Sequence, residues 1–208
     1  MAEWNYGDAY KEYPLTDDPY IFDDGSIVQV HDIFKQLPKF MYDADVMFID
    51  PPWNKGNMTS FYTKAGMIND NGYEAFCNRI FECIGEIHPR ICFVEIGKEY
   101  LADFIIRMRK LYKYVTFYNS TYYKKKDCLC YIVQGSNKRQ NHHLDGMDEE
   151  DIIKWITENI NYTCIGDLCM GRGLVAYYSS LQNKNFVGTE LNTKRLSVAV
   201  KRVRENKL

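Results

Sequence analysis

The strongest constraint on the fold is a short apolar run that ends in an acid and two prolines. Residues 46–49 are all apolar, which is typical of a strand buried on both faces of a parallel sheet. Asp50-Pro51-Pro52-Trp53 follows directly. Open α/β sheets bind ligands at the carboxyl ends of their strands, so Asp50 is expected at such a crevice. The two prolines lack backbone donors, which leaves their carbonyl groups to accept hydrogen bonds.

These four residues suit the binding of a planar ring that carries an exocyclic amino group. The amino group could donate one hydrogen bond to Asp50 and one to the carbonyl of Pro51, while the ring stacks on Trp53. The simpler alternative is a turn at the end of a strand, in which Asp50 caps the next segment and Trp53 belongs to the core. The motif alone does not choose between the two.

A second motif lies near the C-terminus, in residues 167–173 (DLCMGRG). A strand candidate (162–166) precedes it, and a helical stretch (174–181) follows. The two glycines would let the backbone approach a ligand at the N-terminus of that helix. The next strand candidate ends at Glu190, where an acid can bind the two hydroxyls of a ribose. The full dinucleotide fingerprint GxGxxG is absent.

Together the two motifs resemble the S-adenosylmethionine-dependent amino-methyltransferases of nucleic acids. They are similar to the beta group, in which the catalytic motif precedes the cofactor motif. The resemblance covers nearly the whole chain. It implies a single α/β domain over residues 1–208 with a Rossmann-like methyltransferase fold that is circularly permuted. The expected sheet has seven strands, mostly parallel, with a terminal antiparallel hairpin, and both motifs would lie side by side at the ends of its strands.

The resemblance also implies roles for individual residues. The catalytic set is Asp50, Pro51, Pro52 and Trp53. Asp32, at the end of the opening strand, would read the adenine of the cofactor S-adenosylmethionine. Many relatives carry Lys-Pro before the cofactor strand, whereas residues 141–146 read NHHLDG here, so the binding of the methionine carboxylate stays open. The cofactor-binding set is His31, Asp32, Asp50, Asp167, Leu168, Cys169, Gly171, Gly173, Glu190, Leu191 and Asn192.

The implied reaction transfers a methyl group to the exocyclic amino group of adenine in nucleic acid, with DNA preferred over RNA. An acid at the first position of the motif goes mostly with adenine in this group. A cytosine amino-methyltransferase and an RNA adenine methyltransferase stay open as alternatives. A protein side-chain amide methyltransferase and a non-catalytic nucleic-acid-binding subunit are the rivals of other kinds. Cofactor titration would distinguish the last of these, because a scaffold would not bind the methyl donor.

Charge is unevenly distributed along a chain whose net charge is only −2. Residues 105–143 are rich in Lys and Arg and contain a single acid, so this stretch could lie along a phosphate backbone. The alternative is a solvated helix face followed by a charged hairpin. The candidate contacts to nucleic acid are Lys55, Lys124, Lys125 and Lys126.

Apolar residues at helical spacing predict helices over 73–87, 100–112, 148–159 and 174–181. Residues 1–18 are expected to form an extended arm, and the Gly- and Asn-rich stretch 54–72 a mobile loop over the site. The segment 135–147 is too short for a target-recognition domain, which favours a minimal catalytic core. The loop, the Lys124–Lys126 turn or a second subunit would then choose the target, and we expect a homodimer.

The seven cysteines contain no CxxC pair and no metal-ligand spacing with histidine, which predicts reduced thiols and no metal site. The N-terminus is acidic and polar, and no apolar run is long enough to span a bilayer. No membrane partner is therefore expected, and the predicted location is the cytoplasm.

Overall fold

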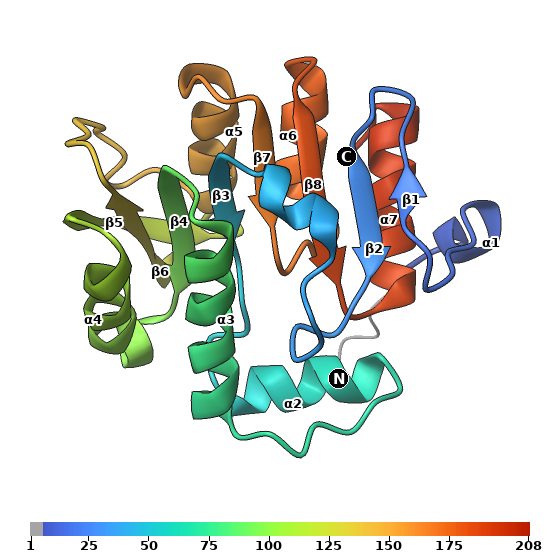
Figure 1. Cartoon of the computed structure of the whole chain (residues 1–208), viewed down its shortest axis with the longest axis horizontal. Coiled ribbons are helices and arrows are strands. Elements are labelled where there is room, and N and C mark those ends of the chain that lie inside the picture. Colours follow the sequence, from blue (N-terminus) through green and yellow to red (C-terminus); the bar gives the residue numbers. More distant parts are fainter. Residues whose placement is uncertain (1–5) are drawn as a thin grey trace.

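An eight-stranded sheet runs through the protein in the order β1-β2-β8-β7-β3-β4-β6-β5 (Figure 1). The computed structural model describes residues 6–208. In chain order the strands are β1 (Tyr20–Ile21), β2 (Ile27–Val30), β3 (Val46–Ile49), β4 (Ile91–Ile96), β5 (Tyr114–Tyr122), β6 (Lys125–Ser136), β7 (Cys164–Asp167) and β8 (Asn185–Glu190).

The five central strands, β2, β8, β7, β3 and β4, are parallel to one another. Antiparallel pairs close both edges, with β1 against β2 on one side and the β5–β6 hairpin against β4 on the other. The predicted mostly parallel sheet with an antiparallel hairpin is therefore confirmed. The count of seven strands is wrong because β1 is only two residues long. Such a short strand shows no alternation that a sequence pattern could reveal.

The four helices predicted from the sequence are all present, with ends within a residue or so of the expected ones. In chain order the α-helices are α1 (Ala9–Glu12), α2 (Lys55–Lys64), α3 (Tyr73–Ile87), α4 (Leu101–Leu111), α5 (Glu149–Asn159), α6 (Leu174–Leu181) and α7 (Thr193–Glu205). Two short 3-10 helices, η1 (Lys39–Asp43) and η2 (Lys98–Tyr100), complete the set.

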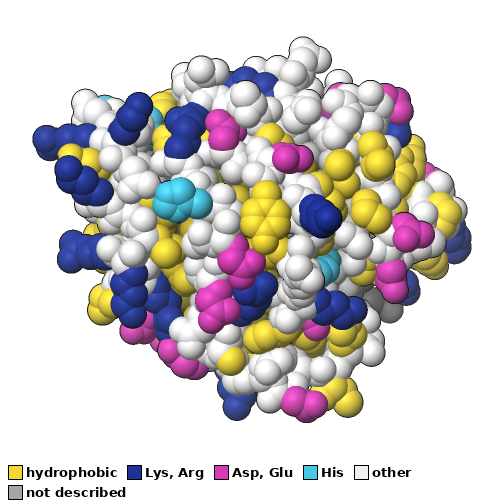
Figure 2. Space-filling view, viewed as in Figure 1, with side chains coloured by type: hydrophobic (Ala, Val, Ile, Leu, Met, Phe, Trp, Pro, Cys, Tyr) yellow, Lys and Arg dark blue, Asp and Glu magenta, His cyan; other side chains and the backbone are white. Residues whose placement is uncertain are grey.

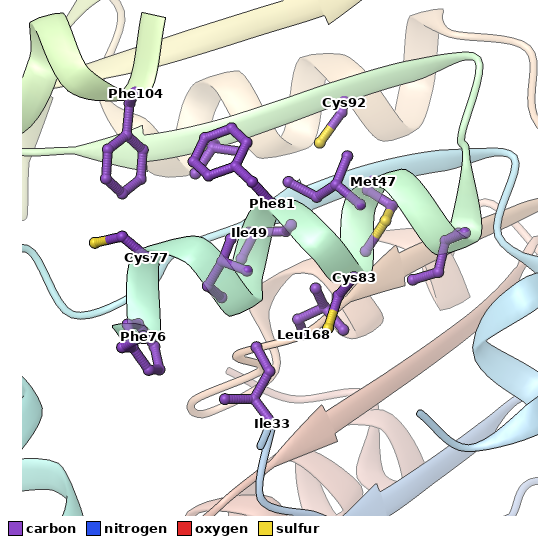
Figure 3. Packing of buried hydrophobic residues seen from close by; sticks show 14 of the residues in the cluster. Ile33, Met47, Ile49, Phe76, Cys77, Phe81, Cys83, Cys92, Phe104 and Leu168 are labelled. Atoms are coloured by element: carbon purple, nitrogen blue, oxygen red, sulfur yellow. The ribbon is translucent and has the colours of Figure 1, made fainter. Parts of the chain in front are cut away.

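Hydrophobic side chains fill the space on both faces of the sheet. Met47 and Ile49 of β3 pack with α3 and α4, and Figure 3 shows Phe76, Phe81 and Phe104 in the same layer. Val46 and Phe48 alternate to the opposite face, where they pack with α5, α6 and α7. This two-sided burial explains the unbroken apolar run of β3 and fixes the strand that carries Asp50 in the middle of the molecule.

The expected loop over residues 54–72 is wrong in its first half, because residues 55–64 form helix α2. The side chain of Asn54 caps this helix by accepting a hydrogen bond from the backbone N–H of Asn57 at 2.9 Å. Of the ten helical residues only Met58 and Tyr62 are buried, so the sequence shows little helical period. Figure 1 shows α2 crossing below the arrowheads of the parallel strands, where it covers their carboxyl ends.

The expected extended arm over residues 1–18 lies partly outside the described residues. Its described part contains the short helix α1, which packs against α7. An ion pair between Glu12 and Lys201 joins the two helices, and the side chain of Ala9 is buried. In the described part of the arm, α1 is therefore folded onto the body of the protein rather than extended.

No helix among the described residues is long and apolar enough to cross a membrane. Within residues 6–208, no group of three or more His, Cys, Asp or Glu side chains is arranged to hold a metal ion.

Candidate active site

Asp50 is the first residue after strand β3 and lies at the carboxyl edge of the sheet. Its carboxylate accepts a hydrogen bond from the indole Nε1 of Trp53 at 3.2 Å. Desolvation raises the pKa of Asp50 to about 6, although the nearby Arg195 guanidinium and the Trp53 hydrogen bond oppose the shift. The acid therefore takes up a proton more readily than an exposed aspartate.

The two prolines and Trp53 are held in place by neighbouring elements. The hydroxyl of Tyr73 donates to the carbonyl of Pro52 at 2.8 Å. The Trp53 ring packs on Gly97, where an added Cβ would lie 3.2 Å from the ring atom Cε3. Tyr122 meets the same ring edge-on, with the ring centroids 5.0 Å apart. Trp53 is thus packed between two elements, and Tyr73 occupies the Pro52 carbonyl rather than that of Pro51.

The glycine turn between β7 and α6 is tied to the end of β8 by one carboxylate. Glu190 accepts hydrogen bonds from the backbone N–H of Gly171 at 2.7 Å and from that of Asn192 at 2.9 Å. Gly171 and Gly173 both have positive φ, 55° and 77°, which disfavours any residue with a side chain. A Cβ on Gly173 would also lie 2.5 Å from that of Ala199 in α7. The turn therefore requires these glycines.

Asp167 and Leu168 fix the start of the same turn. The buried carboxylate of Asp167 accepts a hydrogen bond from the backbone N–H of Cys169 at 2.9 Å, and burial raises its pKa well above the ordinary value. The carbonyl of Leu168 accepts from the hydroxyl of Thr189 at 3.0 Å. The first contact lies within the turn, and the second holds the turn against strand β8.

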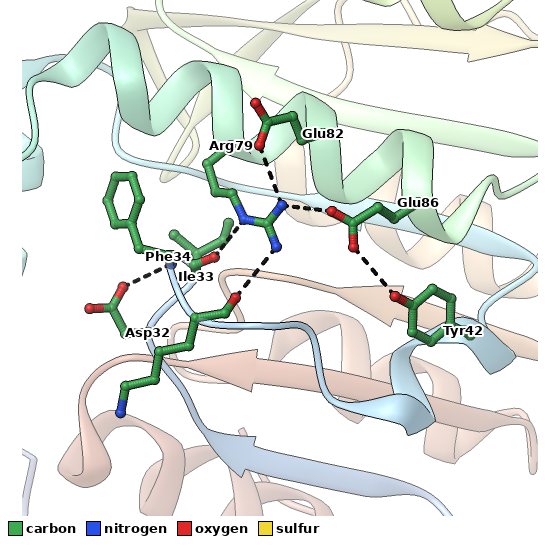
Figure 4. A network of polar contacts seen from close by, with 8 residues as sticks. Asp32, Ile33, Phe34, Tyr42, Arg79, Glu82 and Glu86 are labelled. Atoms are coloured by element: carbon green, nitrogen blue, oxygen red, sulfur yellow. Dashed lines mark hydrogen bonds and ion pairs between the residues drawn. The ribbon is translucent and has the colours of Figure 1, made fainter.

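In the segment after β2, the residues on either side of Asp32 line the site, whereas Asp32 itself is bonded to other parts of the protein. The carboxylate of Asp32 accepts hydrogen bonds from the hydroxyl of Tyr62 at 2.9 Å and the N–H of Phe34 at 3.1 Å. Figure 4 shows how Arg79 of α3 holds this segment, with its Nε 3.0 Å from the carbonyl of Ile33. His31 and Ile33 are the residues of this segment that form the cavity wall.

Two cavities adjoin at Asp50. The larger, which we call the Trp53 cavity, has a volume of about 370 Å³, and its wall includes His31, the Asp50–Trp53 turn, Leu168, Cys169, Glu190 and Leu191. The second, which we call the Glu95 cavity, has about 280 Å³ and a wall that includes Glu95, Glu149, Asp167 and Gly171. Asp50, Tyr122, Tyr123, Cys169 and Arg195 line both.

A third cavity, of about 350 Å³, lies at the opposite end of the strands. Its wall includes Asp45, Arg90 and Thr163, which precede β3, β4 and β7 respectively. Parallel sheets bind ligands at the carboxyl ends of their strands, so the two cavities at Asp50 form the candidate site.

The structure brings most of the predicted site residues together, although they come from three distant parts of the chain. Asn192 is an exception, since its side chain caps helix α7 and donates to the carbonyl of Lys64. Lys55 and the Lys124–Lys126 segment are exposed outside the cavities. Sequence reasoning missed Tyr122, Tyr123 and Arg195, which carry no local signal. It also missed Glu95, although a charged residue inside an apolar strand was a signal.

No family model matches the sequence, and no curated protein matches it. Solved structures do match the fold. M1.HpyAVI is 14% identical, with a TM-score of 0.53 over 85% of this chain and 98% of that chain. TTHA0409 from Thermus thermophilus, provisionally described as a DNA modification methylase, is 13% identical, with a TM-score of 0.57 over 79% and 87%. Structures of both with S-adenosylmethionine also match, with TM-scores of 0.56 for TTHA0409 and 0.51 for M1.HpyAVI. At such low identity the likeness establishes the fold.

Proposed function

We propose that this protein transfers a methyl group from S-adenosylmethionine to the exocyclic amino group of adenine in nucleic acid, with DNA preferred over RNA. The observation that carries the proposal is the position of Asp50, which borders two adjoining cavities at once. A methyl transferase needs such a junction, because the donor and the acceptor must meet at one point. The structures that share this fold include two solved with S-adenosylmethionine.

The Trp53 cavity fits the adenosine part of the methyl donor. His31 supports this placement, since its Nε2 atom is buried at the cavity with no hydrogen-bond partner among the described residues. Burial also lowers the pKa of His31, which keeps the ring neutral and able to bond an adenine. Glu190 would bind the ribose with the lone pairs that its two backbone contacts leave available.

The protein activates the acceptor amine by accepting its hydrogens. The Asp50 carboxylate and the Pro51 carbonyl would each take one N–H, which draws the nitrogen toward tetrahedral geometry and frees its lone pair for attack. The same two acceptors stabilise the positive charge that develops on the nitrogen. Positioning amine and methyl group in line supplies much of the remaining rate enhancement.

A target base would have to leave the duplex to reach Asp50. Base flipping costs a few kcal/mol, and stacking on an aromatic side chain returns about 1–3 kcal/mol per base. We propose that the base stacks on Trp53 beside Asp50, next to Tyr122, which lines both cavities where they meet. Adenine is proposed over cytosine because of the acid at the first position of the motif, in line with the beta group that the sequence resembles.

We also propose that the chain has the permuted strand order of the beta group. Strands β7 and β8 come last in the chain, yet they lie at the centre of the sheet between β2 and β3. This arrangement places the late glycine turn beside the early Asp50 turn. The order of the two motifs along the chain is then the order that the beta group shows.

We also propose a path for the nucleic acid along the β5–β6 hairpin. Figure 2 shows Lys and Arg side chains gathered on the side of the molecule formed by α4 and this hairpin. The turn with Lys124, Lys125 and Lys126 lies at the site end of the hairpin, next to Tyr122 and Tyr123. Lys113 and Lys138 lie near its other end, and all five lysines are exposed.

Replacing Lys124, Lys125 and Lys126 with glutamine should weaken nucleic-acid binding and make it less dependent on salt. Each lost phosphate contact lowers the slope of log K against log salt by about 0.9 for duplex DNA. Fluorescence anisotropy at several salt concentrations measures this slope. Lys154→Gln, on the exposed face of α5, serves as the control. An unchanged slope in the triple variant would place the path elsewhere.

Product analysis tests the proposed function directly. The protein is incubated with labelled S-adenosylmethionine and with DNA or RNA, the nucleic acid is digested to nucleosides, and the labelled product is identified. We expect N6-methyladenine from DNA. Label in cytosine or in RNA would support the alternative substrates, whereas binding of nucleic acid without binding of the methyl donor would indicate a non-catalytic subunit. A homodimer or a second subunit stays a prediction, which sedimentation with activity measurements would check.

A further inference from the structure

Glu95 is an unusual residue at the centre of the molecule. It lies in β4, where Ile91 and Phe93 belong to the core under α5, α6 and α7, and the two-residue period places Glu95 on the same face. The residue is fully buried, with 0% exposure. Neither carboxyl oxygen makes a hydrogen bond to another described residue by distance and angle, and the side chain lines the Glu95 cavity. A buried carboxyl without donors is costly unless a ligand compensates it.

A second acid accompanies Glu95. Glu149, at the start of α5, is also buried and lines the same cavity. Burial together with the neighbouring negative charges raises the pKa of Glu95 far above the usual range. Burial likewise raises the pKa of Glu149 to about 8, helped by Asp50. With raised pKa values these carboxyls tend to keep their protons, and a cation placed beside them would favour their ionised, negatively charged form.

The other acids around this cavity already have structural partners. Asp148 accepts hydrogen bonds from the backbone N–H of Lys124 at 2.6 Å and from the hydroxyl of Thr121 at 3.0 Å. Glu150 accepts from the hydroxyl of Tyr178 at 2.6 Å. Their oxygens are used in holding the hairpin and α6 to α5, whereas neither carboxyl oxygen of Glu95 makes such a contact to another described residue.

We propose that Glu95 and Glu149, together with Asp50, form a counter-charge for the sulfonium of the methyl donor, so that the site binds the cationic donor in preference to the neutral thioether that it becomes. The inference rests on the proposed function. The amine that Asp50 holds must meet the methyl carbon, which puts the sulfonium beside Asp50 and therefore beside the cavity that Glu95 and Glu149 line.

The chemistry of the transfer explains why this charge discriminates. The nitrogen lone pair forms the new C–N bond while the bond from sulfur to the methyl carbon breaks. The electron pair of the broken bond stays on sulfur. The sulfur loses its positive charge, and the charge on nitrogen leaves as a proton. The ammonium and carboxylate of the amino-acid end are the same before and after transfer. Only the sulfonium differs, so a buried set of carboxyls beside it favours the donor and promotes release of the thioether.

Equilibrium binding tests the inference without any turnover. Isothermal titration calorimetry measures the dissociation constants of S-adenosylmethionine and S-adenosylhomocysteine for the full chain. We expect the wild-type protein to bind the methylated, cationic compound at least tenfold more tightly. Glu149→Gln and Glu95→Gln should reduce the ratio of the two dissociation constants several-fold, chiefly by weakening the binding of the cationic compound. Glu158→Gln, an exposed residue at the other end of α5, should leave the ratio unchanged.

The outcomes separate the inference from the proposed function. A wild-type protein without preference for the cationic compound, or a ratio that both variants leave unchanged, would overturn the inference. Failure of the wild-type protein to bind either compound would instead overturn the proposed function. If Glu95→Gln does not fold because of its central position, Glu149→Gln at the start of α5 decides the matter alone, with its unfolding temperature as the check on folding.

Discussion

Replacing Asp50 with alanine should abolish methyl transfer and leave cofactor binding within a few-fold of the wild-type value. The carboxylate lies where the two cavities meet, and in the proposed mechanism its loss removes the group that polarises the amine and stabilises the developing charge. Removal of one such electrostatic contact costs about 10²–10³-fold in rate in other enzymes. Single-turnover transfer of a labelled methyl group measures the effect, and calorimetry measures the binding.

Two further variants sharpen the test of Asp50. Asp50→Asn keeps the shape of the side chain but removes its negative charge, and we expect most of the activity to be lost as well. Asp127→Asn, in the exposed part of the β5–β6 hairpin, is the matched control and should retain activity. If Asp50→Ala transferred methyl groups at the wild-type rate, the amine would have to be activated by another residue.

The pH dependence of transfer should carry the signature of the same carboxyl group. Desolvation raises the pKa of Asp50 to about 6, and the ionised form is the stronger acceptor of an amine N–H and the form whose charge offsets the positive charge developing on nitrogen. The rate should therefore rise as the pH increases through about 6 and fall at lower pH, a higher midpoint than an exposed aspartate would give. In Asp50→Asn this dependence should disappear from whatever activity remains.

The second large effect is expected for Glu190→Ala, which should weaken the binding of the methyl donor and leave nucleic-acid binding intact. The carboxylate is the proposed contact to the ribose, and it also accepts the N–H groups of Gly171 and Asn192. Hydrogen bonds to charged groups contribute about 1.5–3 kcal/mol each, so loss of the ribose contact alone corresponds to roughly ten- to a hundred-fold in affinity. Disorder in the glycine turn would add to the loss.

Comparison of two substitutions at Glu190 separates its structural task from its contact with ligand. Glutamine keeps one acceptor oxygen, so Glu190→Gln should retain more of the turn and lose less affinity than alanine. Glu205→Ala, near the exposed end of α7, controls for removal of an acid elsewhere. An affinity for the methyl donor that is the same in Glu190→Ala and wild type would move the ribose contact to another residue.

Much of the fold could be predicted because its signals are local. The unbroken apolar run before Asp50 indicates a strand that is buried on both faces. The apolar residues at helical spacing in residues 73–87 indicate a helix that buries one face. Helix α2 escaped prediction because only Met58 and Tyr62 are buried in it. A helix that buries so few residues has no continuous apolar face for a sequence pattern to reveal.

Site residues that belong to a contiguous motif could be predicted from the sequence, whereas site residues outside such a motif were missed. Asp50, Gly171 and Glu190 stand in recognisable turns at strand ends, and the structure places all three at the adjoining cavities. Asp32 was assigned from its position after a strand, but its carboxylate is bonded to Tyr62 of α2, which the sequence did not show to be a helix. One missed element therefore changed the surroundings of one predicted residue.

The sequence by itself determined the apolar strands, the turns that end them and the kinds of chemistry those turns can support, because each depends on residues adjacent in the chain. Only the tertiary structure decided that the Asp50 turn and the glycine turn meet, since β7 and β8 insert between β2 and β3. It alone also joined Glu95 to Glu149, because pairing of strands and docking of a helix brought together carboxyls from distant segments. Burial then changed their proton affinity, which depends on three-dimensional surroundings that no local pattern records.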